Sequence, residues 1–347
     1  MQKKSILLKK NRPQNILLIN LKYLGDLIVC SAAIRELKIS FPQAQISFLV
    51  RKEYKDVLRE NPNLHEIIFY DGEIKKIHGL KRFFAELRYI FFLRSKKYDA
   101  VISFQAGDRY AIWSYLSGAK IRIAPIQNNF GFLLTEKVNV IEEDLDYMTY
   151  YLKIVEKFGA RINSKQTDFI LSKGYENWSE EIFDKNKIDR SDIVIGIHPG
   201  ASESTKIWPF ESFQEVISSL TVYPNVKVVL FLGPAESQMK YLVNGLGENV
   251  FPVDTSSSIQ QLAWMISKCS LVICNDSGAR HLSAALKIAT ISLFPEDKIK
   301  PWKFYSEEEK QYFIIGRRNT NSYKKSFLDD INPDEVVEKA KEILELK

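Results

Sequence analysis

The sequence predicts an α/β fold of two doubly wound domains, each a parallel sheet with helices on both faces. Short apolar runs alternate with stretches of helical spacing along most of the chain, which is the pattern of parallel strands joined by helical crossovers. With 347 residues, the chain is also longer than one ordinary hydrophobic core requires. Ligands of such sheets bind beyond the carboxyl ends of the strands, so we expect a binding site in a cleft between the domains.

The first domain is predicted to span residues 1–172. We expect strands where a short apolar run is bounded by polar residues, and helices where apolar residues recur every three or four positions. The predicted strands are 15–20, 45–50, 66–70 and 100–104, with weaker candidates at 120–126 and 137–140. The predicted helices are 27–39, 54–61, 74–95 and 145–158.

The second domain is predicted to span residues 173–347, because a polar stretch at 172–191 interrupts the alternation. Its predicted strands are 193–198, 226–232, 250–253, 271–274 and 289–293. Its predicted helices are 210–220, 237–246, 259–267, 280–286 and 333–344. The last helix is assigned to the second domain, with the option of packing back on the first.

The composition is that of a globular protein, with 45% hydrophobic and 27% charged residues. The cysteines Cys30, Cys269 and Cys274 lie in apolar surroundings without paired spacing, which argues against a disulfide framework or a zinc site. The apolar part of the N-terminus is too short for a signal peptide, and no apolar run reaches membrane-spanning length. We therefore expect a cytoplasmic protein.

Positive charge is concentrated in the first half of the chain. The net charge is +6, and residues 1–170 carry 28 Lys and Arg against 18 Asp and Glu, whereas residues 171–347 carry 21 against 25. A basic half beside a mildly acidic half predicts an anionic partner, either nucleic acid or an anionic lipid surface.

Eight Lys and Arg residues are mixed with aromatic and aliphatic residues between positions 75 and 97. Five apolar residues of this stretch have the spacing of one helical face: Phe83, Phe84, Leu87, Ile90 and Phe91. We expect that face to pack in the core, which leaves the basic side for the anionic partner.

The most informative motif is the run 275–286, NDSGARHLSAAL. A strand that ends in Asp276, Ser277 and Gly278 and continues as a helix presents free N–H groups at a positive helix end, which suits a phosphate. Gly278 lets a ligand approach the backbone, and His281 projects one turn into the helix. The alternative is that Asp276 or Ser277 only caps the helix.

A second motif, LKYLGD at 21–26, follows the first predicted strand. Gly25 permits a tight turn from strand to helix, and Asp26 is placed at the head of the helix. Asp26 then either caps the helix, which is worth about 1 kcal/mol, or faces the cleft as a carboxylate that takes a proton from a hydroxyl nucleophile. These two roles do not exclude each other.

Two further loops follow predicted strands of the second domain. Residues 198–208, HPGASESTKIW, combine small residues and hydroxyls with Lys206, which offers N–H groups, hydroxyl donors and positive charge to a phosphate. The alternative is a solvated surface loop, and the Walker spacing is absent. Glu236 follows the strand 226–232 and can accept from ribose hydroxyls, although an ordinary turn explains it equally well.

Several enzyme classes lack their sequence signals. G-x-G-x-x-G does not occur, which argues against a dinucleotide-dependent oxidoreductase, and G-x-S-x-G does not occur, which argues against a serine hydrolase. The four histidines have no partners at metal-ligand spacing, so we expect no metal site.

The order and spacing of the motifs resemble the ADP-heptose:lipopolysaccharide heptosyltransferases, glycosyltransferase family 9. The similar features are GD at a helix start, HPGA followed by a lysine and WP, GP-x-E, and NDSG-x-x-H, between residues 15 and 305. The segment 97–105, KYDAVISFQ, also resembles the fourth strand of that family. The resemblance implies two Rossmann-like domains of the GT-B fold and an inverting transfer without metal or cofactor.

The resemblance also assigns roles by position. Asp26 would be the general base, Lys206 would hold the donor's diphosphate, and Glu236 would bind the adenosine ribose. The hydroxyls that assist Lys206 would be those of Ser202, Ser204 and Thr205. The residues lining the diphosphate and the sugar would be Asp276, Ser277, Gly278 and His281. Lys22 and Gly25 complete the predicted substrate-binding set, and LKYLGD is most similar to the subgroup that adds the third core heptose.

These roles agree with the chemistry of glycosyl transfer. Negative charge develops on the leaving diphosphate, and Lys206 with the helix that starts at Gly278 would stabilise it. Asp26 would take the acceptor's proton from the other domain, so domain closure would assemble the site. The segment 294–298 departs from the small, threonine-bearing loop of the family, which leaves the donor sugar open.

The expected partners are an ADP-sugar donor, a lipopolysaccharide core acceptor and the anionic inner face of the inner membrane, and not nucleic acid. The first domain would bind the acceptor and the second the nucleotide sugar. The alternatives are a GT-B transferase that uses another nucleotide sugar, a sugar-nucleotide epimerase of the same fold, and a non-catalytic sugar-binding protein.

Overall fold

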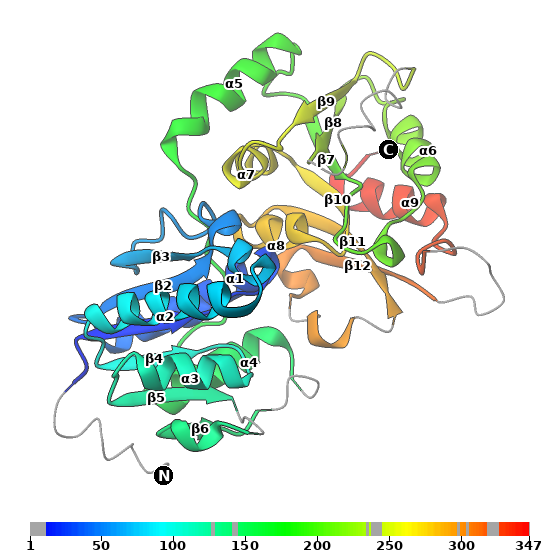
Figure 1. Cartoon of the computed structure of the whole chain (residues 1–347). Coiled ribbons are helices and arrows are strands. Elements are labelled where there is room, and N and C mark those ends of the chain that lie inside the picture. The colour runs from blue at the N-terminus through cyan, green and yellow to red at the C-terminus, as the bar shows by residue number, and fades with distance from the viewer. Residues whose placement is uncertain are drawn as a thin grey trace. The chain divides into compact units, whose positions relative to one another are not determined.

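The chain forms two compact units, residues 1–168 and 169–347, in a computed structural model (Figure 1). In each unit helices flank one parallel β-sheet of six strands, which confirms the predicted fold class. The model describes residues 12–125, 129–140, 145–233, 236, 245–296, 299–302, 305–317 and 326–346.

The sheet of the first unit has the strand order β3-β2-β1-β4-β5-β6, and all neighbouring strands are parallel. The strands are β1 (Asn15–Ile19), β2 (Gln45–Arg51), β3 (Glu66–Tyr70), β4 (Ala100–Ser103), β5 (Ile121–Pro125) and β6 (Glu136–Val138). The α-helices are α1 (Leu24–Ser40), α2 (Gly79–Ser95), α3 (Asp108–Leu116) and α4 (Tyr147–Phe158). The strand order reverses between β1 and β4, as in a doubly wound sheet.

The helices of the first unit pack in pairs. α1 packs against α4, and α2 contacts α3. Ile90 and Leu93 of α2 and Trp113 of α3 join Leu17 and Ile19 of β1 in one buried cluster. Because successive residues of a strand point to opposite faces, Leu17 and Ile19 mark the face that α2 and α3 cover.

The apolar face predicted for α2 is only partly buried. Ile90 and Leu93 are buried, but Phe83, Phe84 and Phe91 are exposed, so the prediction that this face packs in the core is wrong for the three phenylalanines. A helix turns by about 100° per residue, which places Phe84 and Phe91 almost opposite Leu93. The helix therefore rests on its Ile90 and Leu93 side and turns the phenylalanines outward.

The sheet of the second unit has the order β12-β11-β10-β7-β8-β9, again all parallel. The strands are β7 (Ile193–His198), β8 (Val226–Leu232), β9 (Val250–Asp254), β10 (Leu271–Asn275), β11 (Ala289–Pro295) and β12 (Gln311–Gly316). The α-helices are α5 (Glu176–Lys185), α6 (Phe210–Leu220), α7 (Ile259–Ser267), α8 (Gly278–Ala285) and α9 (Pro333–Leu344). Counted from its own first strand, this sheet repeats the strand order of the first unit.

The helices of the second unit also pack in pairs. α7 contacts α8, and α6 packs against α9. Val336, Val337 and Ala340 of α9 are buried in the same cluster as Phe213 of α6 and Ile273 of β10. The last helix therefore packs within the second unit.

Some elements differ from the prediction. The helix predicted at 54–61 is wrong, because a short 3₁₀ helix, Lys52–Tyr54, is followed there by turns. α3, α5 and β12 were not predicted, and the last strand is β12 rather than 289–293. α5 buries only Ser179, and its polar sequence lies in the stretch 172–191, where the domain boundary is predicted. The helix predicted at 237–246 lies mostly outside the described residues.

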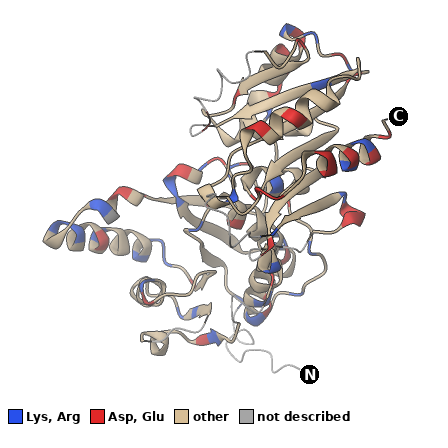
Figure 2. Ribbon diagram, turned by 90° about the vertical axis from the view of Figure 1, so that its right-hand side faces the viewer, with Lys and Arg blue, Asp and Glu red and all other residues tan. Residues whose placement is uncertain are grey.

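Among the described residues, no helix is long and apolar enough to cross a membrane. Lys and Arg are interspersed with Asp and Glu over both units, and α9, the helix next to the C-terminus, carries both signs of charge (Figure 2).

Candidate active site

The predicted site residues follow the strands at which each sheet reverses its order. In the second unit these are β7 and β10, which are neighbours with Cys274 opposite His198. In the first unit the turn after β1 lies at the corresponding place. Such reversal points are where ligands bind in doubly wound sheets, so the topology brings the loops after β7 and β10 to one place.

A buried ion pair joins those two loops. Lys206 Nζ lies 2.8 Å from Asp276 Oδ2, and only 11% and 5% of the two side chains are exposed. On the other carboxylate oxygen, Arg280 Nη2 lies 3.6 Å from Asp276 Oδ1. The more exposed Glu203 lies 3.8 Å from Lys206. Two cations therefore share one buried carboxylate, and the second carboxylate near them, that of Glu203, is exposed.

Asn275 holds the same loops together through hydrogen bonds. Its side-chain amide donates to Pro199 O at 2.6 Å, and its Oδ1 accepts from Trp208 N at 3.2 Å. Asn275 is completely buried, so these bonds fix the loop after β7 against the end of β10. The motif NDSG contains this residue, but the sequence alone indicated no role for it.

Helix α8 begins without a side-chain cap. Ser277 occupies the N-cap position but makes no capping hydrogen bond, and its Oγ is buried without a partner among the described residues. Asp276 binds Lys206 instead of the helix. The capping interpretation is therefore wrong for both side chains, and the hydroxyl of Ser277 lies beside Gly278 at the positive helix end.

His281 lies in a buried cluster with Arg280 and Tyr305. His281 Nε2 is 3.0 Å from Arg280 Nη2, and its Nδ1 is 3.4 Å from the Tyr305 hydroxyl. Burial, followed by the charges of Arg280 and Lys206, lowers the pKa of His281 well below its usual range. The neutral ring accepts from the guanidinium at Nε2, so Nδ1 carries the proton.

Arg280 is completely buried and was not predicted as a site residue. Its guanidinium lies 4.9 Å from the ring centre of Phe294 and 5.5 Å from that of Tyr305, and it donates to Trp302 O at 3.2 Å. Arg280 therefore links the segment after β11 to the start of α8. Of the segment 294–298, whose role was left open, residues 297 and 298 lie outside the described residues.

Glu236 is buried and packs against two glycines. Its Oε2 accepts from Gly233 N at 3.1 Å, and a Cβ at Gly200 would lie 2.1 Å from its Oε1. Only glycine at position 200 allows this approach. Burial lowers the pKa of His198, and the nearby charge of Glu236 opposes that shift.

The other residues predicted to bind the diphosphate lie in the loop after β7. Ser204, Thr205 and Lys206 form a short 3₁₀ helix. Ser202 and Ser204 are exposed and Thr205 is half-buried. Their contact with a ligand stays a prediction.

Asp26 is the third residue of α1, which starts at Leu24 with Tyr23 as its N-cap. The predictions that the helix starts at residue 27 and that Asp26 caps it are therefore wrong, and Gly25 lies in the first helical turn instead of a tight loop. Asp26 is nearly buried. Its Oδ1 accepts a 2.6 Å hydrogen bond from the Tyr151 hydroxyl and lies 3.8 Å from Lys22 Nζ.

Neighbouring side chains fix the turn that carries Asp26. The buried Asn20 accepts from Lys22 N at 3.0 Å and donates to Cys30 Sγ at 3.0 Å. Burial and the charge of Asp26 raise the pKa of Tyr151, so its hydroxyl stays protonated and donates a hydrogen bond to the carboxylate. Tyr151 comes from α4, and no motif near Asp26 indicated it.

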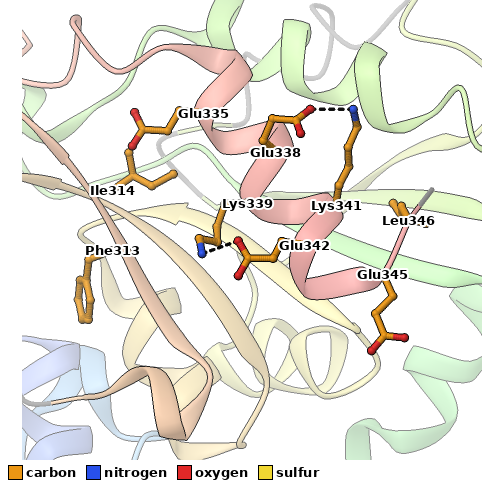
Figure 3. A pocket seen from close by; sticks show the side chains of 9 residues that line it. All are labelled: Phe313, Ile314, Glu335, Glu338, Lys339, Lys341, Glu342, Glu345 and Leu346. Atoms are coloured by element: carbon orange, nitrogen blue, oxygen red, sulfur yellow. Dashed lines mark hydrogen bonds and ion pairs between the residues drawn. The ribbon is translucent and has the colours of Figure 1, made fainter.

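A separate pocket of about 760 Å³ lies on the second unit between β12 and α9 (Figure 3). Lys339 pairs with Glu342 at 2.7 Å, and Lys341 pairs with Glu338 at 2.9 Å. Its lining includes none of the predicted site residues, and its lysines are already neutralised. Among the described residues, no group of three or more His, Cys, Asp or Glu is placed to hold a metal ion.

Comparison with known proteins defines the class as a glycosyltransferase. The model of glycosyltransferase family 9 (heptosyltransferase) matches residues 87–329, and the chain belongs to this family. The chain is 23% identical to lipopolysaccharide heptosyltransferase 3 of Escherichia coli K12, over 93% of this chain and 96% of the relative. It is 23% identical to lipopolysaccharide heptosyltransferase 1 of Campylobacter coli, over 80% and 83%.

Solved structures show the same fold. A family 9 glycosyl transferase from Veillonella parvula DSM 2008 superposes with a TM-score of 0.82 at 19% identity, over 96% of this chain and 98% of that one. The E. coli heptosyltransferase WaaC with ADP superposes with a TM-score of 0.75 at 16% identity, over 95% and 99%. Both resemblances confirm the pair of Rossmann-like domains.

Proposed function

We propose that the protein moves a heptose from ADP-heptose to a hydroxyl of the lipopolysaccharide inner core, with inversion at the anomeric carbon and without a metal ion or cofactor. Membership of family 9 and the names of the two curated relatives support the sugar and the acceptor. The observation that carries the proposal is the buried Lys206–Asp276 pair beside the uncapped start of α8.

The second unit binds the donor in this proposal. Asp276 holds Lys206 beside the N–H groups at the start of α8 and the hydroxyl of Ser277, and these donors suit a diphosphate. When the bond between the sugar and the diphosphate breaks, negative charge grows on the leaving ADP, and the same groups stabilise it. Glu236 would accept from the ribose hydroxyls.

The first unit supplies the base. The acceptor hydroxyl forms a bond to the anomeric carbon from the face opposite the diphosphate, and its proton passes to the Asp26 carboxylate. Tyr151 donates to Asp26 Oδ1 at 2.6 Å and so fixes the orientation of that carboxylate. Lys22, 3.8 Å from the same oxygen, would contact the acceptor or the donor.

A donor and acceptor screen tests the proposal. ADP-, UDP- and GDP-sugars would be offered with core acceptors that carry no heptose, one heptose or two heptoses. We expect ADP release that requires both ADP-heptose and one of these acceptors. Turnover with another nucleotide sugar would change the donor, epimerised sugar without acceptor would indicate an epimerase, and binding without turnover would indicate a sugar-binding protein.

The proposed acceptor also indicates where in the cell the protein acts. A lipopolysaccharide core is attached to a lipid anchor, so the proposal places the protein in the cytoplasm, in peripheral contact with the anionic inner face of the inner membrane. The excess of basic residues in the first half of the chain supports this placement.

A further inference from the structure

Helix α2 exposes an apolar stripe on its outer side. Leu80, Phe84 and Phe91 are 75%, 64% and 66% exposed, and their spacing of four and seven residues puts them on one side of the helix. Phe83, which is 56% exposed, adjoins this stripe. Single exposed apolar residues are ordinary, but a contiguous group of large ones marks an interaction surface.

The opposite side of α2 is firmly held. Ile90 and Leu93 are buried in the core of the first unit. Glu86 pairs with Arg109 Nη2 at 2.7 Å, and the Arg109 guanidinium lies 4.3 Å from the ring centre of Trp113. The outward direction of the stripe is therefore fixed by the inner packing.

The charges of the exposed side have one sign. Lys81, Arg82 and Arg88 are exposed, and none of them pairs with an acidic residue in the part of the chain that the structure describes. Glu86 is the only acidic residue of α2, and Arg109 neutralises it. Lys81 and Arg88 are seven residues apart, so they form a basic row beside the apolar stripe.

We infer that α2 docks on an anionic lipid bilayer, with Leu80, Phe84 and Phe91 inserted at the level of the headgroups. Lys81 and Arg88 would contact the anionic headgroups. An amphipathic helix with aromatic residues on one side and cations beside them is suited to lie in a membrane interface. The inference rests on the proposed function, which brings the protein to a lipid-anchored acceptor, and names the surface that makes the contact.

The charges favour a bilayer over a second copy of the chain. Two α2 stripes packed antiparallel would place the basic rows of both copies on the same side and close together, and like charges oppose such contact. An anionic surface instead attracts all of these residues at once. The anionic bilayer is therefore the occupant whose charge complements the helix.

Vesicle flotation tests the inference with the full chain. Vesicles of phosphatidylcholine alone would be compared with vesicles that also contain phosphatidylglycerol, at low and high salt. We expect binding to the anionic vesicles that weakens with salt. K81E/R88E should weaken binding by at least about fivefold for each charge changed, and F84S/F91S should weaken it at both salt concentrations.

Matched controls come from exposed residues elsewhere. Phe132→Ser replaces a phenylalanine that is 72% exposed, and Lys185→Glu reverses an exposed charge on α5; neither should reduce flotation. All variants should keep the wild-type melting temperature, because the changed side chains are exposed. Equal binding to both vesicle types, or equal losses in the controls, would overturn the inference.

Two further measurements separate this inference from the proposed function and from self-association. Transfer of heptose to a truncated core acceptor without lipid should be the same in F84S/F91S as in the wild type. If the wild type bound anionic vesicles but transferred no heptose, the result would count against the proposed function alone. In analytical ultracentrifugation, the wild-type protein should not form a dimer that depends on Phe84 and Phe91. A dimer that F84S/F91S abolishes would show that the stripe binds a second copy of the chain, and would overturn the inference that it binds a bilayer.

Discussion

At Asp26 the hydrogen bond from Tyr151 allows the proposed role in catalysis to be tested apart from a role in folding. Asp26→Asn keeps an oxygen that accepts from the Tyr151 hydroxyl, 2.6 Å away in the wild type, so the melting temperature should change little. The amide cannot accept the acceptor's proton, and loss of a general base costs about 10² to 10⁴ in rate. We expect kcat with the core acceptor to fall by that factor.

The matched measurement is the affinity for ADP, which should be unchanged in Asp26→Asn because the diphosphate contacts are proposed in the second unit. Tyr151→Phe removes only the orienting hydrogen bond and should reduce kcat less than Asp26→Asn. Turnover of Asp26→Asn near the wild-type rate would show that another group takes the proton.

The Lys206–Asp276 pair makes a second prediction, on donor binding. Lys206→Ala removes a charged donor, and a hydrogen bond to a charged group is worth about 1.5–3 kcal/mol, so Kd for ADP should rise by about 10- to 150-fold in calorimetry. The same change leaves Asp276, whose side chain is 5% exposed, with Arg280 as its remaining cation, and should lower the melting temperature.

The double variant Lys206→Ala/Asp276→Asn separates these two effects. Removing the buried charge as well should restore part of the stability, because an uncompensated buried carboxylate is costly. It should not restore ADP binding. Recovery of binding together with stability would show that Lys206 acts only as a structural partner of Asp276.

The neutral state of His281 predicts how stability depends on pH. Because burial and neighbouring cations lower the pKa of His281 in the folded protein, the unfolded chain binds a proton more readily. Stability is therefore fully present above the unfolded pKa of about 6.5 and falls as pH drops below it. We expect His281 to contribute a slope of up to about 1.36 kcal/mol per pH unit there.

Chemical denaturation between pH 7.5 and 5 measures this slope. His281→Gln keeps an acceptor for Arg280 and should flatten the dependence. His198, whose pKa is also lowered, should contribute a slope of the same sign. A pH dependence that is identical in wild type and His281→Gln would contradict the neutral assignment.

In the loop after β7, the absence of a side chain at Gly200 allows the Glu236 carboxylate to pack against the backbone. A Cβ at Gly200 would come within 2.1 Å of Glu236 Oε1, so Gly200→Ala must displace the end of the Glu236 side chain. We expect weaker binding of ADP with a small loss of stability, because the displaced end is flexible. The coupling between Gly200 and Glu236 in ADP binding is measured from the ADP affinities of Gly200→Ala, Glu236→Gln and the double variant.

If Gly200 acts by placing Glu236, the losses in the single variants should not add in the double variant. Gly233 also touches this carboxylate, and Gly233→Ala is the matched comparison. Additive losses would mean that Gly200 contacts the nucleotide independently of Glu236.

At the level of elements, the sequence predicted the sheets better than the start of each helix. The buried strands are short apolar runs with few alternatives, and β7, β8 and β10 lie where predicted, within a residue. α1 begins three residues earlier than predicted, at Leu24, because Tyr23 and not Asp26 occupies its N-cap position. The polar α5 buries only Ser179 and has no recognisable apolar pattern, whereas the edge strand β12 was missed although its sequence, QYFIIG, contains an apolar run.

The candidate site was predictable only where its residues follow a strand in the chain. Lys206 and Asp276 were both expected after strands, and the structure joins them. Asn275 and Tyr151 were not expected, because their partners lie more than seventy residues away in the chain. Arg280 was missed although it pairs with Asp276 four residues earlier, and its other partner, Trp302, is distant in the chain. Contacts of that kind have no local sequence pattern.

At the scale of the molecule, the two units share one strand order but present different side chains at the reversal point. After β1 the first unit offers the carboxylate of Asp26, whereas after β7 and β10 the second unit offers Lys206 and the start of α8. The shared topology determines where the candidate site lies in each unit, and the loops that follow the strands provide its reactive and ligand-binding side chains. We propose that this difference divides the binding of acceptor and donor between the two units.

Hydrogen exchange on the full chain with saturating ADP tests that division. ADP at 100 times its Kd should stabilise the protein by about 2.7 kcal/mol. The strongest new protection should fall on residues 199–208 and the first turn of α8, because their N–H groups are proposed to face the diphosphate. α1 should change less, and Lys206→Ala at the same ADP concentration should lose most of the protection. Stronger protection at α1 than at α8 would reverse the roles of the two units.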